Sequence, residues 1–146
     1  MREALLVFVD GTIADDRRRL PLLGTEAFNL PENLLADGAV PGSAACLASL
    51  SCRREIVYVG ARDPSLTALT RAWLSQNGFP DGEVLLGRTY EERLAFSREA
   101  AVRHAFVAGI GDRWDDSALH QELGIRSIIV REYEGDWASV GRWLGD

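Results

Sequence analysis

Cysteine is scarce in this sequence of 146 residues, and long apolar runs and an excess of positive charge are missing. Cys46 and Cys52 form no C-x-x-C pair or Cys/His cluster, which argues against zinc and predicts reduced thiols. No apolar run reaches the roughly 18 residues of a membrane span, and no signal-peptide pattern is present, so we expect a cytoplasmic protein. The net charge of −6 makes nucleic acid an unfavourable partner, because phosphate binding depends on Lys and Arg.

The sequence does contain short apolar runs that alternate with helix-like stretches. We expect strands at residues 4–9, 56–59, 84–86, 105–108 and 126–130. Near-continuous apolar strands are typical of a parallel sheet that is covered on both faces. Five helices are expected. The first begins with Pro41 in its first position, and the second has Asp63 as its N-cap, Pro64 in its first position and Gly78 as its stop. The others are expected at 90–101, at 114–123, where Gly124 is the stop, and at 137–144.

This alternation predicts one α/β domain over residues 1–146, with a doubly wound, mainly parallel sheet of five strands and helices on both faces. The length suits a single domain and leaves little room for a second independent core. Residues 15–39 interrupt the alternation and form a long insertion after the first strand. The sequence leaves open whether this insertion is a partial lid or a packed surface loop.

Three polar clusters follow predicted strands. They are Asp10-Gly11-Thr12, Arg62-Asp63 and residues 112–116. In doubly wound sheets ligands bind beyond the carboxyl ends of the strands, so these clusters should face one crevice. Carboxylates there can hold Mg²⁺, and the amides of a glycine turn can bind phosphate. Each cluster alone has an ordinary structural explanation, and their convergence is the functional signal.

The stretch from Val7 to Asp15 resembles the first motif of the haloacid dehalogenase (HAD) superfamily, and residues 111–116 resemble its fourth motif, GDxxxD. The resemblance follows the order of the motifs from about residue 4 to residue 130, and it is closest to small phosphatases without a cap. It implies Mg²⁺-dependent transfer of a phosphoryl group from a phosphomonoester. Its implied site residues are Asp10 as the catalytic group, Gly11, Thr12, Gly60, Arg62 and Arg93 for the phosphate, and Asp10, Asp112 and Asp116 for the metal.

The sequence departs from the family pattern at the most important position. The pattern begins DxDGT, and its first Asp is the nucleophile; matching on Asp10-Gly11-Thr12 puts Phe8 there and gives Asp10 the acid/base position. Gly60 stands where the second motif has a hydroxyl residue. Near the position where the third motif has a lysine, this sequence offers only Arg93 or Arg98.

Two functions follow from this resemblance. The first is a Mg²⁺-dependent phosphomonoesterase whose activity is weak or impaired, with Asp10 acting in the acid/base role or shifted into the nucleophile's role. The second is an inactive HAD-like protein that binds phosphate or metal and has a regulatory role. In both, the expected ligand is a phosphorylated small molecule or another phosphomonoester. A receiver-like domain is disfavoured, because Asp10 stands alone at the end of the first strand.

Overall fold

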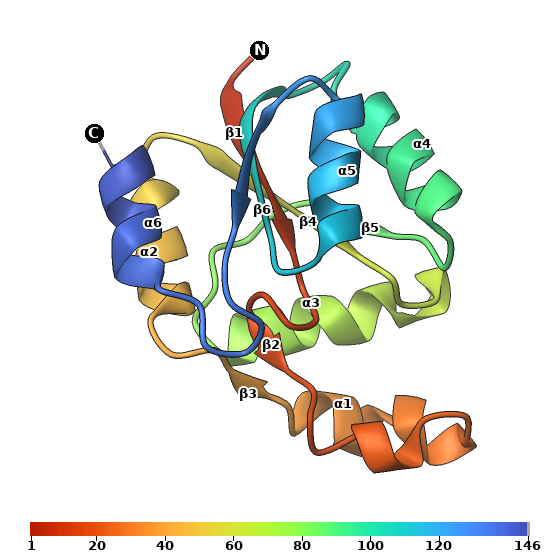
Figure 1. Ribbon diagram of the computed structural model, residues 1–146. Coiled ribbons are helices and arrows are strands. Elements are labelled where there is room, and N and C mark those ends of the chain that lie inside the picture. Colours follow the sequence, from red (N-terminus) through yellow and green to blue (C-terminus); the bar gives the residue numbers. More distant parts are fainter. Residues whose placement is uncertain (146) are drawn as a thin grey trace.

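A five-stranded parallel sheet forms the centre of the computed structural model, which describes residues 1–145 (Figure 1). Its strands are β1 (Glu3–Phe8), β4 (Glu55–Gly60), β5 (Val84–Leu86), β6 (Ala105–Gly111) and β7 (Arg126–Ile129). The order across the sheet is β5-β4-β1-β6-β7, and each neighbouring pair is parallel. The predicted doubly wound α/β fold is therefore confirmed, and the strand ends lie within three residues of the expected ones.

Helices cover both faces of the sheet, which explains why its strands are apolar along their length. One face is covered by α2 (Ser43–Leu50), α3 (Thr67–Gln76) and α6 (Trp137–Leu144), and the other by α4 (Tyr90–Ala100) and α5 (Trp114–Glu122). Successive side chains of a strand point to opposite faces. Along β1 and the next residue, Leu5, Val7 and Val9 enter the larger core, while Ala4, Leu6 and Phe8 enter the smaller one.

The helix boundaries follow the predicted signals, with one clear correction. Gly78 and Gly124 follow their helices in the left-handed conformation, as expected. The prediction that Pro41 is the first residue of a helix is wrong. Gly42 is the N-cap, with φ at 83°, and α2 begins at Ser43, because the left-handed backbone at Gly42 interrupts the chain after Pro41.

The helix after β4 also starts later than expected. Asp63 accepts a hydrogen bond from the amide of Ser65 at 2.8 Å, which confirms its capping role. The residues that it caps, however, form a 3-10 turn, η3 (Pro64–Leu66), and α3 begins at Thr67.

The insertion at residues 15–39 has secondary structure of its own. The strands β2 (Ala14–Asp15) and β3 (Gly38–Ala39) pair antiparallel at its base, and between them lie η1 (Leu20–Leu22), η2 (Glu26–Asn29) and α1 (Pro31–Leu35). Elements this short carry too little periodicity to be predicted. The segment extends beyond the end of the sheet at which β1 ends (Figure 1). It packs on α3, where the indole nitrogen of Trp73 donates to the carbonyl of Asp37 at 2.8 Å.

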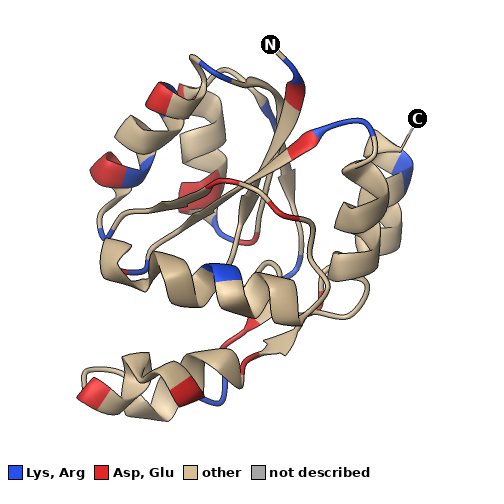
Figure 2. Cartoon of the chain, turned by 180° about the vertical axis from the view of Figure 1, so that it is seen from behind, with Lys and Arg blue, Asp and Glu red and all other residues tan. Residues whose placement is uncertain are grey.

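Charged residues lie in the connections and on the outer surfaces of helices, and the middle of the sheet is uncharged (Figure 2). The charged residues within the strands of the sheet are Glu3, Glu55 and Arg126, and each is the first residue of its strand. None of the described helices is long and apolar enough to cross a membrane. Both cysteines are free thiols.

Candidate functional site

Asp10 lies just after β1 and forms a bidentate ion pair with Arg62, which follows β4. Arg62 Nε lies 3.0 Å from Asp10 Oδ2, and Arg62 Nη2 lies 2.8 Å from Oδ1. The hydroxyl of Thr70 accepts from Arg62 Nη1 at 3.0 Å, which fixes the guanidinium. Burial raises the pKa of Asp10, but Arg62 and the nearby Arg19 outweigh this, so its pKa lies below the usual value. Asp10 is therefore an ionised carboxylate with both oxygens occupied.

A second ion pair connects this site to the insertion. Arg19 is almost fully buried and makes two hydrogen bonds of 2.8 Å to the carboxylate of Asp37. The same guanidinium lies 3.6 Å from Asp10, and its Nη1 donates to the carbonyl of Phe28. Arg62 also lies 3.6 Å from Asp37. The two arginines and two aspartates thus form one network, which the sequence did not predict.

Phe8 is the last residue of β1 and stands two residues before Asp10, where the HAD pattern has its nucleophile. Its side chain is only 6% exposed and packs in the smaller core. The ring lies edge-on to His120, with the centroids 6.0 Å apart. Burial lowers the pKa of His120 to about 4, so this neighbour is neutral and provides no charge behind Phe8.

The fourth-motif residues lie against the glycine turn that follows Asp10. Asp112 Oδ1 accepts from the Thr12 hydroxyl at 2.7 Å, and Asp116 Oδ2 accepts from the amides of Asp112 and Arg113 at 3.0 and 3.1 Å. Gly11 has φ of 87°, and a β-carbon there would lie 2.4 Å from Asp112 Oδ2. Glycine is therefore required at position 11, because the backbone is left-handed there and because Asp112 leaves no space for a β-carbon.

Burial raises the pKa of both fourth-motif carboxyls. The pKa of Asp112 rises to about 7; the hydrogen bond from Thr12 opposes the rise, while the charges of Asp116 and Glu132 add to it. The pKa of Asp116 rises to about 6, although its two backbone amides oppose this. Asp112 Oδ2 is buried without a hydrogen-bond partner among the described residues. Arg113 partly offsets the rise at Asp116, so burial outweighs the positive charge near this pair.

A cleft of about 270 Å³ opens beside Phe8, at the carboxyl end of the sheet. It is lined by three acidic residues, three arginines and three apolar or small residues: Asp10, Asp115, Asp116, Arg88, Arg93, Arg113, Phe8, Gly60 and Ala61. Arg93 is nearly buried, and its Nη1 donates to the carbonyl of Gly87 at 3.0 Å. Guanidinium groups in a partly enclosed cleft are suited to bind a phosphoryl group.

The structure brings most of the predicted residues to one edge of the sheet, in two groups. Asp10, Gly60, Arg93 and Asp116 line the cleft, while Gly11 and Thr12 form the neighbouring turn, against which Asp112 packs. Arg62 forms the ion pair with Asp10 that is described above. The site residues assigned from the sequence did not include Arg19, Asp37, Arg88, Arg113 or Asp115. Two signals were present in the sequence: Arg113 and Asp115 lie within the polar cluster at residues 112–116, and Arg19 ends a run of three arginines, which fits either a solvated loop or the rim of a phosphate site.

The predicted three-carboxylate magnesium site is not assembled in this arrangement. Within residues 1–145, no group of three or more His, Cys, Asp and Glu side chains is placed to hold a metal ion. Asp10 faces two arginines, and one oxygen of Asp116 accepts two amides. Of the three predicted ligands, the pair Asp112 and Asp116 fits a hard cation best, because it has an unpartnered buried oxygen and raised pKa values.

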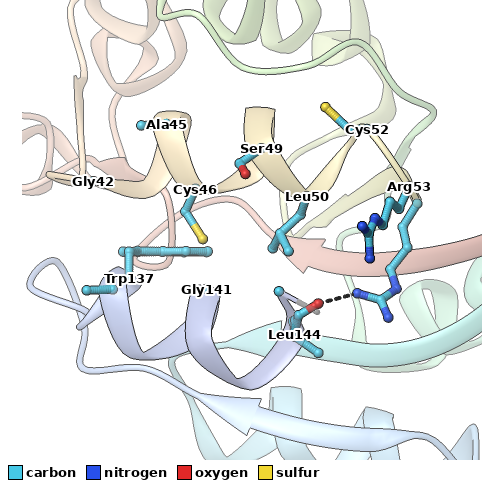
Figure 3. A pocket seen from close by; sticks show the side chains of 13 residues that line it. Gly42, Ala45, Cys46, Ser49, Leu50, Cys52, Arg53, Trp137, Gly141 and Leu144 are labelled. Atoms are coloured by element: carbon cyan, nitrogen blue, oxygen red, sulfur yellow. Dashed lines mark hydrogen bonds between the residues drawn. The ribbon is translucent and has the colours of Figure 1, made fainter.

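A larger groove, of about 660 Å³, lies between α2 and α6 (Figure 3). Cys46, Leu50, Trp137 and Leu144 are among its lining residues, and Arg54 donates to the carbonyl of Leu144 at one end. None of the described lining residues is acidic. Because phosphoryl chemistry requires carboxylates or a metal, the smaller charged cleft is the better candidate site.

Several solved structures share this fold. One chain of the Pnkp1/Rnl/Hen1 RNA repair complex matches with a TM-score of 0.69 and 16% identity, over 93% of this chain and 44% of that chain. A haloacid dehalogenase-like hydrolase from Streptococcus pneumoniae matches with a TM-score of 0.69 and 13% identity, over 92% and 88%. A HAD family enzyme from Bacteroides thetaiotaomicron, a mutant solved with magnesium and inorganic phosphate, matches with a TM-score of 0.58 and 14% identity, over 96% of this chain and 99% of that chain.

These likenesses establish that the chain has the HAD-like fold, as the motifs indicated. The chain spans less than half of its match in the RNA repair complex and most of the other two. At such low identity the likeness concerns the fold alone. No protein-family model and no curated protein sequence matches the chain.

The ion pair between Arg19 and Asp37 should be essential for stability. Asp37→Asn removes the charge that pairs with the buried Arg19 at 2.8 Å and leaves it only the more distant Asp10, so we expect a loss of about 3–5 kcal/mol in the free energy of unfolding. Asp15→Asn is the matched control, because Asp15 pairs with exposed Arg17 and such pairs contribute at most about 1 kcal/mol. Urea denaturation measures both. A loss for Asp37→Asn no larger than that of the control would contradict the network's structural role.

The raised pKa values of Asp112 and Asp116 predict that the protein becomes more stable as the pH falls from about 8 to about 6.5 in the presence of EDTA; below this range buried His120, whose pKa is lowered to about 4, opposes the trend. In the folded state the pKa values of Asp112 and Asp116 are about 7 and 6, above the model value of 3.8. The native state therefore binds more protons in this window, and the stability is lost as the pH rises through these values. Denaturation midpoints across the window test this. Asp112→Asn should flatten the trend and Glu122→Gln, an exposed change, should not; a flat wild-type profile would refute it.

Proposed function

We propose that this protein is a HAD-like phosphate-binding protein of the hydrolase type, whose phosphomonoesterase activity is weak or lost. The observation that carries the proposal is Phe8, which lines the arginine-rich cleft at the nucleophile's position in the HAD pattern. A phenyl ring cannot attack phosphorus to form the covalent intermediate. Loss of such a group typically lowers rates by about 10⁴- to 10⁶-fold.

The state of Asp10 supports the same conclusion. A general acid must carry a proton at the working pH, and the lowered pKa of Asp10 leaves it ionised. A nucleophile needs available electron density, and the bidentate ion pair with Arg62 draws charge from both oxygens of Asp10 and so weakens it as a nucleophile. Both observations support a weakened role for Asp10, as acid/base and as nucleophile, in the proposed function.

The ligand that we propose is a phosphorylated small molecule. Arg93 is fixed by Gly87 at the cleft wall, and Arg88 and Arg113 lie at its more exposed part. The Bacteroides thetaiotaomicron structure with the same fold holds inorganic phosphate and magnesium, which is consistent with such a ligand.

The proposed partial lid is the insertion at 15–39, because Arg19 links it to Asp10 at the cleft. The cytoplasmic location stays a prediction.

Mg²⁺ is part of the proposal, with Asp112 and Asp116 as the residues that would hold it. When bound, it would supply positive charge next to the phosphoryl oxygens. We expect weak binding, because only two carboxylates are available and one oxygen of Asp116 is already engaged.

Phe8→Asp should create measurable hydrolysis of a small aryl phosphate in the presence of Mg²⁺, at least about 10²-fold above wild type. Phe8→Asn is the matched control, because it has a similar shape and polarity but no attacking carboxylate. Recovery should be partial, since Gly60 provides no hydroxyl group. The proposal fails if the wild type itself turns over at about 1 s⁻¹ and Asp10→Asn abolishes this, because Asp10 would then be the nucleophile.

Millimolar Mg²⁺ should raise the melting temperature of the wild type, because a ligand that binds only the folded state stabilises it. Asp112→Asn should abolish the shift, while Glu122→Gln should keep it. Thermal melts with Mg²⁺ and with EDTA give the comparison without any activity assay. An unchanged melting temperature in the wild type would exclude the two-carboxylate site at this concentration.

A further inference from the structure

Asp115 occupies an unusual position in the cleft, between two of its arginines. Asp115 Oδ2 lies 3.8 Å from Arg93 Nη2, and Asp115 Oδ1 lies 3.5 Å from Arg113 Nε. All three side chains line the 270 Å³ cleft. Asp115 belongs to the variable part of the GDxxxD pattern, so the motif assigns it no role.

The carboxylate of Asp115 is poorly held where it stands. Both contacts to the arginines are longer than ordinary hydrogen bonds. Its Oδ1 is buried and has no hydrogen-bond partner within the described part of the chain. By contrast, both oxygens of Asp37 accept hydrogen bonds of 2.8 Å from Arg19. Asp115 therefore neutralises the arginines without forming a strong pair.

The arginines themselves are placed to receive a better anion. Arg93 is anchored through Nη1 to the carbonyl of Gly87, which leaves Nη2 directed to the region of Asp115. Arg113 is largely exposed and its long side chain can adapt. The amides of Asp112 and Arg113 already donate to Asp116, so on this side of the cleft the guanidinium groups are the donors for an incoming anion.

We propose that Asp115 occupies the place of the ligand's anionic group between Arg93 and Arg113, and that a ligand must displace it to bind. This rests on the proposed phosphate-binding function and adds the basis of its selectivity. Replacing one single negative charge with another gains little electrostatic energy, whereas a dianionic phosphoryl group adds a second charge to the same two arginines. Asp115 thus makes the cleft selective for dianions over monoanions such as carboxylates.

The test is calorimetric titration of the full chain with inorganic phosphate and with acetate, at about pH 7.5 and constant ionic strength. We expect Asp115→Asn to bind phosphate roughly tenfold more tightly than wild type and to gain relatively more affinity for acetate, so that the preference for phosphate falls. Asp115→Glu keeps the charge and should retain the weak, selective binding of the wild type. Arg93→Met should abolish phosphate binding.

Glu91→Gln is the matched control, because Glu91 is the second residue of α4 as Asp115 is of α5, and both lie in the first turn of their helices. If Glu91→Gln tightens phosphate binding as much as Asp115→Asn, net charge alone explains the effect and the inference fails. If the wild type binds phosphate but Asp115→Asn binds no better, the inference fails and the proposed function stands. If neither wild type nor any variant binds phosphate, the proposed function itself fails.

Discussion

The bidentate ion pair between Asp10 and Arg62 joins the ends of the two neighbouring strands β1 and β4, and much of the site depends on it. Charges this close to a core are costly unless they are paired in good geometry, and here the geometry is supplied on both sides. Thr70 of α3 orients Arg62, and Arg19 of the insertion provides a second positive charge. Two separate parts of the chain therefore reach this carboxylate directly, and a third, α3, acts through Arg62.

The same network determines where the insertion lies. Arg19 contacts Asp37 at the far end of the insertion, Phe28 in its middle and Asp10 in the sheet domain. Its guanidinium also lies over the ring of Phe28, with 4.6 Å to the centroid. A segment with such short helices has little stability of its own. A buried arginine with partners on both sides gives it a fixed attachment beside the cleft.

Much of the fold was predictable, because buried parallel strands must be apolar along their whole length and glycine marks the ends of several helices. The start of α2 was not, since Pro41 is a good first residue of a helix and only the backbone of Gly42 decides otherwise. In the site, Asp10, Thr12 and Asp112 could be placed together from the strand ends. The buried partner of Asp37 could not be predicted, because nothing in the local sequence distinguishes Arg19 from the adjacent Arg17 and Arg18, which are exposed.

The distribution of charge around Phe8 agrees with a cleft that binds phosphate without attacking it. All 16 basic residues of the chain are arginines, and three of them line this cleft. Arginine binds a phosphoryl group through paired donors and remains charged, so it holds an anion well. A nucleophilic carboxylate at position 8 would place a negative charge beside that anion, and phenylalanine removes both the repulsion and the reaction. In the proposed function, an apolar ring at position 8 therefore favours retention of the ligand over its turnover, although three aspartates also line the cleft.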